Sequence, residues 1–118
     1  MRAFSFAQAI AAGHEPRQYR DYVLEGEATA VLDFKMWGNS ACLRCCFTEL
    51  RTGNQFTLAV YNRNSGQKTD RYTPCDQRID FSSPGIEGSV FHLVTVRGKR
   101  GGIVWESAEV LAGAIPEA

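Results

Sequence analysis

The sequence predicts an all-β fold, a small five-stranded barrel preceded by a short helical extension. Several segments after Gly26 alternate apolar and polar residues with a period of two, as half-buried strands do. Residues 5–13 are the one segment with a convincing helical pattern. Because the open edges of a small sheet invite aggregation, we expect the strands to close into a barrel. A chain of 118 residues suits a single core and therefore one domain.

The N-terminal extension covers residues 1–24. Ser5 is a suitable helix N-cap, Phe6 and Ile10 follow helical spacing, and Gly13 is a suitable end for the helix. A second short turn begins at Pro16.

The barrel is expected within residues 25–112, with residues 113–118 as a frayed tail. The expected strands cover residues 27–37, 41–50, 55–62, 89–97 and 102–111. In the first strand the even-numbered residues from 28 to 36 share one face. The polar, turn-rich segment 63–88 is predicted to be a long excursion in which only residues 78–81 form a short strand. Trp105 is expected in the core, and so is His92, because it alternates with valines.

Three strands, a long connection and two more strands form a layout that resembles the OB-fold, the five-stranded Greek-key barrel, in its single-stranded DNA-binding members. The resemblance covers residues 25–112 and includes Gly88 before the fourth strand and the charged hairpin at residues 98–102. It implies a binding cleft on the face of strands two and three, flanked by the loops between strands one and two and between strands four and five. The lack of an evident helix between strands three and four departs from many members.

The net charge of zero hides a segregation along the chain. Residues 34–100 hold ten basic and five acidic residues, whereas both ends are acidic. Arginine supplies ten of the thirteen positive charges. Its planar guanidinium suits phosphate contacts and stacking on bases better than the point charge of lysine does. The pattern therefore favours an anionic ligand.

Binding a single strand without reading its sequence requires cations along the phosphates and exposed aromatic faces for the bases. The predicted ligand is single-stranded DNA, with RNA as the alternative. The predicted cationic contacts are Arg44, Arg63, Lys68, Arg71, Arg97, Lys99 and Arg100. The predicted stacking residues are Trp37, Tyr61 and Tyr72.

Two other functions compete with this hypothesis. The first is a protein-interaction or assembly module, in which the N-terminal helix and open strand edges mediate docking or homo-oligomerisation. This function explains why catalytic motifs are scarce, but it does not explain the segregation of charge along the chain. Residues 80–85 also match the D-x-S-x-x-G element of PilZ domains, which would place Asp80, Ser82 and Gly85 at a cyclic dinucleotide. The R-x-x-x-R element of that family is missing, since Arg17 and Arg20 have only two residues between them.

No paired-carboxylate, nucleophile, Walker or histidine-cluster motif occurs, so we expect no enzyme and no cofactor. Cys42, Cys45 and Cys46 are predicted to be reduced core residues. Cys42 and Cys45 point to opposite faces of a strand, which argues against a shared metal. No apolar run approaches the roughly 20 residues of a membrane-spanning helix, so we expect a cytoplasmic protein without a membrane partner.

Overall fold

The structure, a computed structural model, describes residues 3–38, 42–64 and 67–113, with the backbone alone at residues 63, 64, 67 and 68. An α-helix and a 3-10 helix precede six strands. The elements are α1 (Phe6–Ala11), η1 (Pro16–Arg20), β1 (Gly26–Trp37), β2 (Cys42–Glu49), β3 (Gln55–Asn64), β4 (Gln67–Thr73), β5 (Val90–Arg97) and β6 (Ile103–Ala112).

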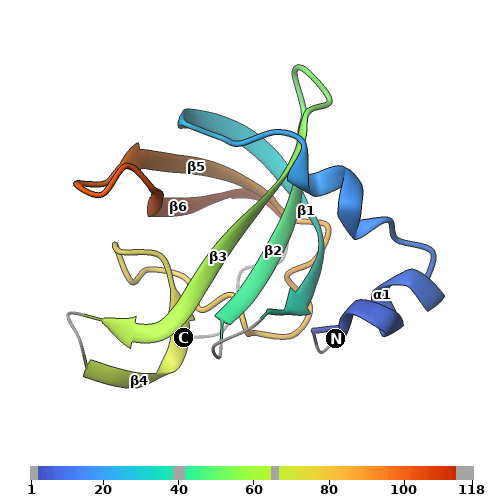
Figure 1. Cartoon of the computed structure of the whole chain (residues 1–118), viewed down its shortest axis with the longest axis horizontal. Helices are drawn as coiled ribbons and strands as arrows, with labels where there is room; N and C mark the ends of the chain where they lie inside the picture. Colours follow the sequence, from blue (N-terminus) through green and yellow to red (C-terminus); the bar gives the residue numbers. More distant parts are fainter. Residues whose placement is uncertain (1–2, 39–41, 65–66, 114–118) are drawn as a thin grey trace.

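All six strands form one antiparallel sheet in the order β4-β3-β2-β1-β5-β6, curled into a half-barrel (Figure 1). The all-β prediction is confirmed, but the expected number of five strands is wrong. The additional strand, β4, lies in the segment expected to be an excursion, and residues 78–81 form no strand. β4 is a polar edge strand, so it lacks the apolar alternation by which a half-buried strand is found.

A β-bulge at Asp33 divides β1 into two halves. The register with β2 shifts between Leu32 and Phe34, and Asp33 has no direct partner. Leu32 therefore faces the core of the half-barrel, whereas Phe34 and Met36 face outward and Lys35 faces inward. The prediction that residues 28 to 36 keep one face is wrong beyond Leu32, because a bulge exchanges the two faces of a strand.

Aromatic side chains form the centre of the main core. The Phe47 ring packs against the rings of Phe56, Phe81, Phe91 and Trp105, with centroid distances between 5.7 and 6.3 Å. All five residues are buried. The Phe56 ring is stacked on Phe47 and the other three rings meet it edge-on, so they contribute both buried area and directional packing. This cluster connects β2, β3, β5, β6 and the loop after β4.

The predicted position of His92 is wrong. Its Nε2 lies 2.9 Å from Oε1 of Glu27 on the outer face of β5 and β1, where the His92 side chain is half-buried. Phe91 and Leu93 take the inward positions instead. Both faces of this strand are apolar in sequence, so alternation alone does not show which face is the core.

The N-terminal extension packs on the outer face of the sheet. Ser5 and Gln8 form a reciprocal capping box at the start of α1, as the sequence predicts. The backbone of Phe4 adds to the second half of β1 through hydrogen bonds with Lys35 and Trp37. Beneath α1 and η1 lies a second cluster of buried residues, made of Ala9, Tyr19, Phe34, Met36 and Cys46.

Lys35 ties a loop to the interior of the half-barrel. Its side chain is 1% exposed, and Nζ donates to the carbonyl oxygens of Phe81 at 2.9 Å and Ser83 at 2.8 Å. Oε1 of Glu87 lies 3.8 Å from Nζ. Burial lowers the pKa of Lys35, and the charge of Glu87 opposes that shift. The ammonium group therefore neutralises the loop's carboxylate and satisfies two of its carbonyls.

Replacing Lys35 by methionine is expected to lower the free energy of unfolding by about 3 kcal/mol, because Glu87 loses its counter-charge and two buried carbonyls lose their donor. Urea denaturation at neutral pH measures the change. The matched control is Lys99→Met at the exposed β5–β6 turn, which should change stability by no more than about 0.5 kcal/mol. A loss below about 1 kcal/mol for Lys35→Met would show that the ammonium group does not stabilise this loop.

Candidate binding groove

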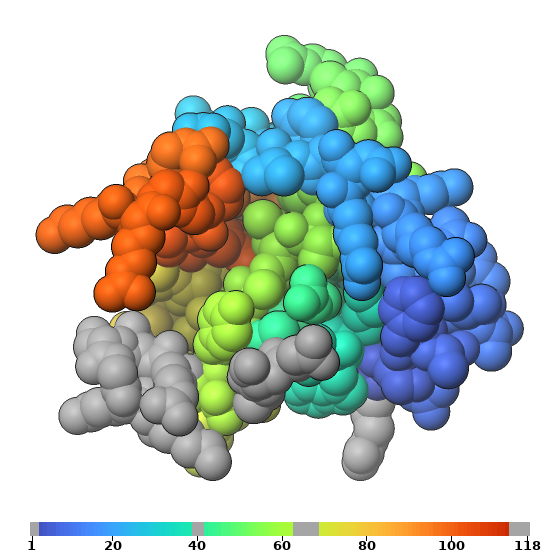
Figure 2. All heavy atoms as spheres, viewed as in Figure 1, coloured from blue at the N-terminus to red at the C-terminus, as the bar shows by residue number. Residues whose placement is uncertain are grey.

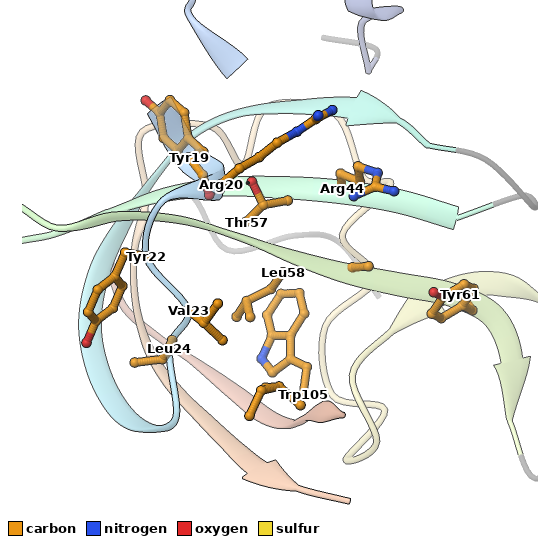
Figure 3. A pocket seen from close by; sticks show the side chains of 12 residues that line it. Tyr19, Arg20, Tyr22, Val23, Leu24, Arg44, Thr57, Leu58, Tyr61 and Trp105 are labelled. Carbon is orange, nitrogen blue, oxygen red and sulfur yellow. Dashed lines mark hydrogen bonds between the residues drawn. The ribbon is translucent and has the colours of Figure 1, made fainter. Parts of the chain in front are cut away.

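A groove of about 340 Å³ lies on the side of the half-barrel where β3 and β6 approach each other. In Figure 2, a recess separates the green side chains of β3 from the orange β5–β6 hairpin. Figure 3 shows the lining side chains, which come from η1, the segment after it, β2, β3 and β6. The groove thus combines strands two and three of the sheet with the N-terminal extension.

The groove exists because the half-barrel is only partly closed along this line. β4 pairs with β3 from Tyr61 onward, and the chain after β4 reaches β6, where Cys75 N donates to the Trp105 carbonyl at 3.1 Å and Asp76 N to the Glu106 carbonyl at 2.9 Å. In the described pairings, residues 55–60 of β3 have β2 as their only neighbouring strand. We call the opening between residues 55–60 and the start of β6 the seam.

Tyr19 holds η1 against the outer face of the sheet. Its hydroxyl donates to Oδ2 of Asp33 at 2.8 Å, and this oxygen also accepts from Oγ1 of Thr48 at 2.5 Å. Nε2 of Gln55 donates to the Tyr19 hydroxyl at 3.2 Å, and Oγ1 of Thr57 donates to the Tyr19 carbonyl at 3.3 Å. Burial raises the pKa of Tyr19, and its hydrogen bond to Asp33 raises it further. These contacts determine where the following residue, Arg20, leaves η1.

Residues 21–25, which we call the strap, cross from η1 to the start of β1 (Figure 1). The far end of the strap is anchored on β5. The Leu24 carbonyl accepts from Oγ1 of Thr95 at 2.8 Å. Glu25 forms a bidentate pair with Arg97, with distances of 2.6 and 3.1 Å. Hydrogen bonds with Arg97 lower the pKa of Glu25, and those with Glu25 raise the pKa of Arg97.

Two arginines flank the outer face of β2 beside the groove. Burial raises the pKa of the Cys46 thiol to about 11, while the charges of Arg44 and Arg20 lower it, so both guanidinium groups lie near this thiol. In Figure 3, Arg20 extends along β2 in the direction of Arg44. Tyr61 is on the same face as Arg44, because it lies opposite Cys42 in the register, and is 51% exposed. An anion in the groove would meet two positive charges here.

The sheet separates the predicted aromatic residues into two groups. Trp37 lies opposite Leu43 in the register, so it shares the inner face with the core rather than the outer face with Tyr61. Its indole ring, 47% exposed at the end of β1, meets the half-buried ring of Tyr72 edge-on with a centroid distance of 5.4 Å. Trp37 and Tyr72 therefore form a second aromatic surface that does not line the groove.

The charged β5–β6 hairpin contributes differently at each residue. Arg97 is paired with Glu25 and also donates to the Gly101 carbonyl within the turn. Lys99 and Arg100 are exposed at the turn. Ile103, just after the turn, lines the groove, but Arg97, Lys99 and Arg100 are not among its lining residues.

The remaining predicted residues lie around β4. Arg63 and Lys68 are paired in the backbone register of β3 and β4, and their side chains lie outside the described part of the chain. Arg71 is exposed on β4. None of the three is among the residues that line the groove as described.

Asp80 of the D-x-S-x-x-G match has a role within the loop. Its Oδ1 accepts hydrogen bonds from the backbone N of Tyr72, the backbone N of Ser82 and Oγ of Ser82, at 3.1, 3.0 and 2.7 Å. Gly85 has a φ of +82° and makes a turn that favours glycine. This carboxylate thus joins β4 to the loop that Lys35 holds.

Sequence reasoning missed Arg20 and Tyr22, both of which line the groove. Residues 17–22 read Arg-Gln-Tyr-Arg-Asp-Tyr, and this interleaving of basic and aromatic residues is the signal that leads to the other candidates. The sequence predicts that this segment belongs to an extension outside the barrel, and only the fold brings it beside β2 and β3. The extension is therefore part of the site.

The four cysteines are free thiols, with Cys75 exposed and the other three buried. Within the described ranges, no three histidine, cysteine or acidic side chains come together as a metal site requires. In the same part of the chain, no helix has both the length and the apolar character needed to cross a membrane.

Comparison with known proteins gives no match: no family model, no curated protein and no solved structure shows significant similarity to this chain.

Tyr19→Phe is expected to lower the free energy of unfolding by about 1.5 to 3 kcal/mol, because it removes a hydrogen bond to the charged Asp33. Chemical denaturation measures the change. The matched control is Tyr22→Phe three residues away, where the hydroxyl is removed from an exposed side chain and a change within about 0.5 kcal/mol is expected. Equal effects of the two substitutions would contradict the anchoring role of Tyr19.

The raised pKa of Cys46 predicts a loss of stability in alkali. The unfolded thiol ionises near 9.0 and the folded thiol near 11, so the unfolded state releases its proton first and stability falls as pH rises from 9 to 11. Cys46→Ala should reduce this loss by about 2 kcal/mol. Urea unfolding under reducing conditions at pH 8 and pH 11 provides the measurement. Burial also raises the pKa of the exposed Cys75 thiol, so Cys75→Ala is the comparison and should recover less stability than Cys46→Ala. An unchanged loss in Cys46→Ala would mean that this thiol is not held neutral by the fold.

Proposed function

We propose that the protein is a non-enzymatic, OB-like barrel that binds single-stranded nucleic acid in the groove between β2, β3, β6 and the strap. The observation that carries the proposal is the pair of arginines, Arg20 and Arg44, beside the tyrosines Tyr22 and Tyr61 in one groove. The planar guanidinium groups of arginine neutralise phosphates, and exposed aromatic rings contribute about 1–3 kcal/mol of stacking energy per base. Neither contact depends on base sequence.

The strand order supports the OB-like part of the proposal. β1, β2 and β3 form a meander, and β5 returns through a long connection to pair with β1 on the side opposite β2. A fourth strand that lies beside the first, in the order 4-1-2-3, defines the Greek key. β4 is then an additional edge strand within the long connection. The groove lies on the face of strands two and three and next to the last hairpin, where OB-folds bind oligonucleotides.

The charges around the groove support an anionic, extended ligand. Arg20 and Arg44 line the groove, and the exposed Lys99 and Arg100 stand at the turn that precedes Ile103, a lining residue of β6. A strand that contacts these cations releases condensed counterions, so its affinity falls with salt. Trp37 and Tyr72 offer a second stacking surface across the edge of the sheet for a strand longer than the groove.

The test is fluorescence anisotropy of a labelled, mixed-sequence single-stranded DNA of about 15 nucleotides, measured between 50 and 200 mM salt. The double variant Arg20→Ala, Arg44→Ala should weaken binding at 50 mM salt by about tenfold or more. It should also reduce the slope of log affinity against log salt by about 1.4, the value for two phosphate contacts on a single strand. The same sequence in RNA compares the two ligands.

The matched control removes the same number of charges elsewhere. Arg51 lines a different depression with Glu27, Glu49 and His92, and Arg78 lies 3.9 Å from Asp76. Arg51→Ala with Arg78→Ala should leave the affinity within about twofold and the salt slope unchanged. Equal losses in the two double variants would contradict a localised groove. No binding of DNA or RNA at 50 mM salt would reject the proposal in favour of a protein-interaction module, which a defined oligomer in analytical ultracentrifugation would then support.

A further inference from the structure

The groove has two chemically different halves. The half over β2 and β3 is polar and holds Arg20, Arg44 and Thr57. The half at the seam is apolar and is lined by Val23, Leu58, Ile103 and Trp105. A ligand that fits both halves carries an anionic group and a flat or apolar group side by side. A nucleotide has this composition, with its phosphate at one end and its base at the other.

The floor of the seam is a rigid aromatic surface. Trp105 is 5% exposed, and its Nε1 donates to the Ser107 carbonyl at 2.9 Å. The indole is packed against Phe47 at 90° with a centroid distance of 5.7 Å and against Phe81 at 4.7 Å. Figure 3 shows the indole beside Leu58, below β3. Only a small part of the indole is exposed, and this part is held rigidly, so its contact with a planar group costs little conformational entropy.

The wall formed by β3 carries backbone polar groups that face the seam. In residues 55–60 every second backbone pair points away from β2, and no described backbone hydrogen bond links this edge to β6 or to the strap. Such an edge presents N–H donors and C=O acceptors in a row. The rim of a nucleobase carries complementary donors and acceptors, and proteins bind unstacked bases through these groups.

We infer that the seam is a pocket for one unstacked nucleobase, which enters between β3 and β6 above Trp105 while its flanking phosphates contact Arg20 and Arg44. This inference rests on the proposed function and names the part of the strand that the groove recognises. A volume of about 340 Å³ is near the lower limit of small-ligand sites, which suits a single base rather than a stack. A duplex keeps its bases paired and stacked, so the pocket selects single strands.

The first experiment compares a 12-nucleotide oligothymidylate with an abasic deoxyribose-phosphate chain of the same length. Both ligands carry the same phosphates, so the two salt slopes should agree, whereas the abasic chain should bind at least about tenfold more weakly, from the loss of one or more base contacts. Equal affinities would overturn both the base pocket and the stacking on Tyr22 and Tyr61, and would leave only the phosphate contacts of the proposed function. Failure of both ligands to bind at 50 mM salt would overturn the proposed function and the base pocket with it.

The second experiment locates the base. An oligothymidylate with 5-iodouracil at one position is photo-crosslinked to the protein, and mass spectrometry identifies the modified residue. Cross-links are expected at Trp105 or Tyr22, which line the groove. Cross-links confined to Trp37 or Tyr72, which do not line the groove, would place the base outside it and overturn the inference.

A matched pair of variants tests the apolar wall without disturbing the core. Val23 on the strap is 64% exposed, and Leu50 in the β2–β3 turn is 57% exposed. Val23→Ser should weaken oligothymidylate binding about threefold and leave abasic binding unchanged, because it removes apolar contact from the pocket mouth alone. Leu50→Ser should change neither ligand. Equal effects of Val23→Ser on the two ligands would contradict insertion of a base beside the strap.

Discussion

The bulge at Asp33 is the constraint on which the other features of this structure depend. One extra residue in β1 exchanges the inner and outer faces of the strand at its midpoint. The first half then directs Leu32 into the main core, and the second half directs Phe34 and Met36 outward. The outward residues give α1 and η1 an apolar surface to cover. The Asp33 carboxylate, on that outer face, accepts a hydrogen bond from the Tyr19 hydroxyl and so anchors η1 in place.

The same bulge connects the fold to the candidate site in two directions. On the outer face, the anchor at Tyr19 starts the strap beside β3 and leads to Arg20 and Tyr22 in the groove. On the inner face, the exchange of sides buries Lys35, whose ammonium group holds the loop that follows β4. That loop follows residues 75 and 76. The backbone of these two residues hydrogen-bonds to β6 and closes part of the half-barrel. The seam, between residues 55–60 of β3 and the start of β6, is the part of the half-barrel that neither the strap nor this loop segment closes.

Because the half-barrel is partly closed, only a short stretch of strand edge is exposed at the seam. Another chain therefore finds little free edge there on which to pair and aggregate. The strap covers the seam from one side, and residues 75 and 76 occupy part of the edge of β6. What remains is a short stretch of β3 above a buried indole, with two arginines at its rim. The proposed nucleic-acid function and the base pocket both follow from this arrangement of a polar rim and an apolar interior.

Local pattern in the sequence determined the strands with apolar alternation, the capped helix at Ser5 and the burial of Trp105, because each depends on residues near one another in the chain. Tertiary structure decided the bulge at Asp33, the pairing of the polar strand β4 and the outward position of His92. A bulge, an edge pairing and the choice of core face all depend on which strand lies alongside. The same holds for the groove. The basic and aromatic character of Arg44 and Tyr61 was enough to predict them as binding residues. Their separation from Trp37 and their proximity to Arg20 depend on strand register and on packing between distant segments.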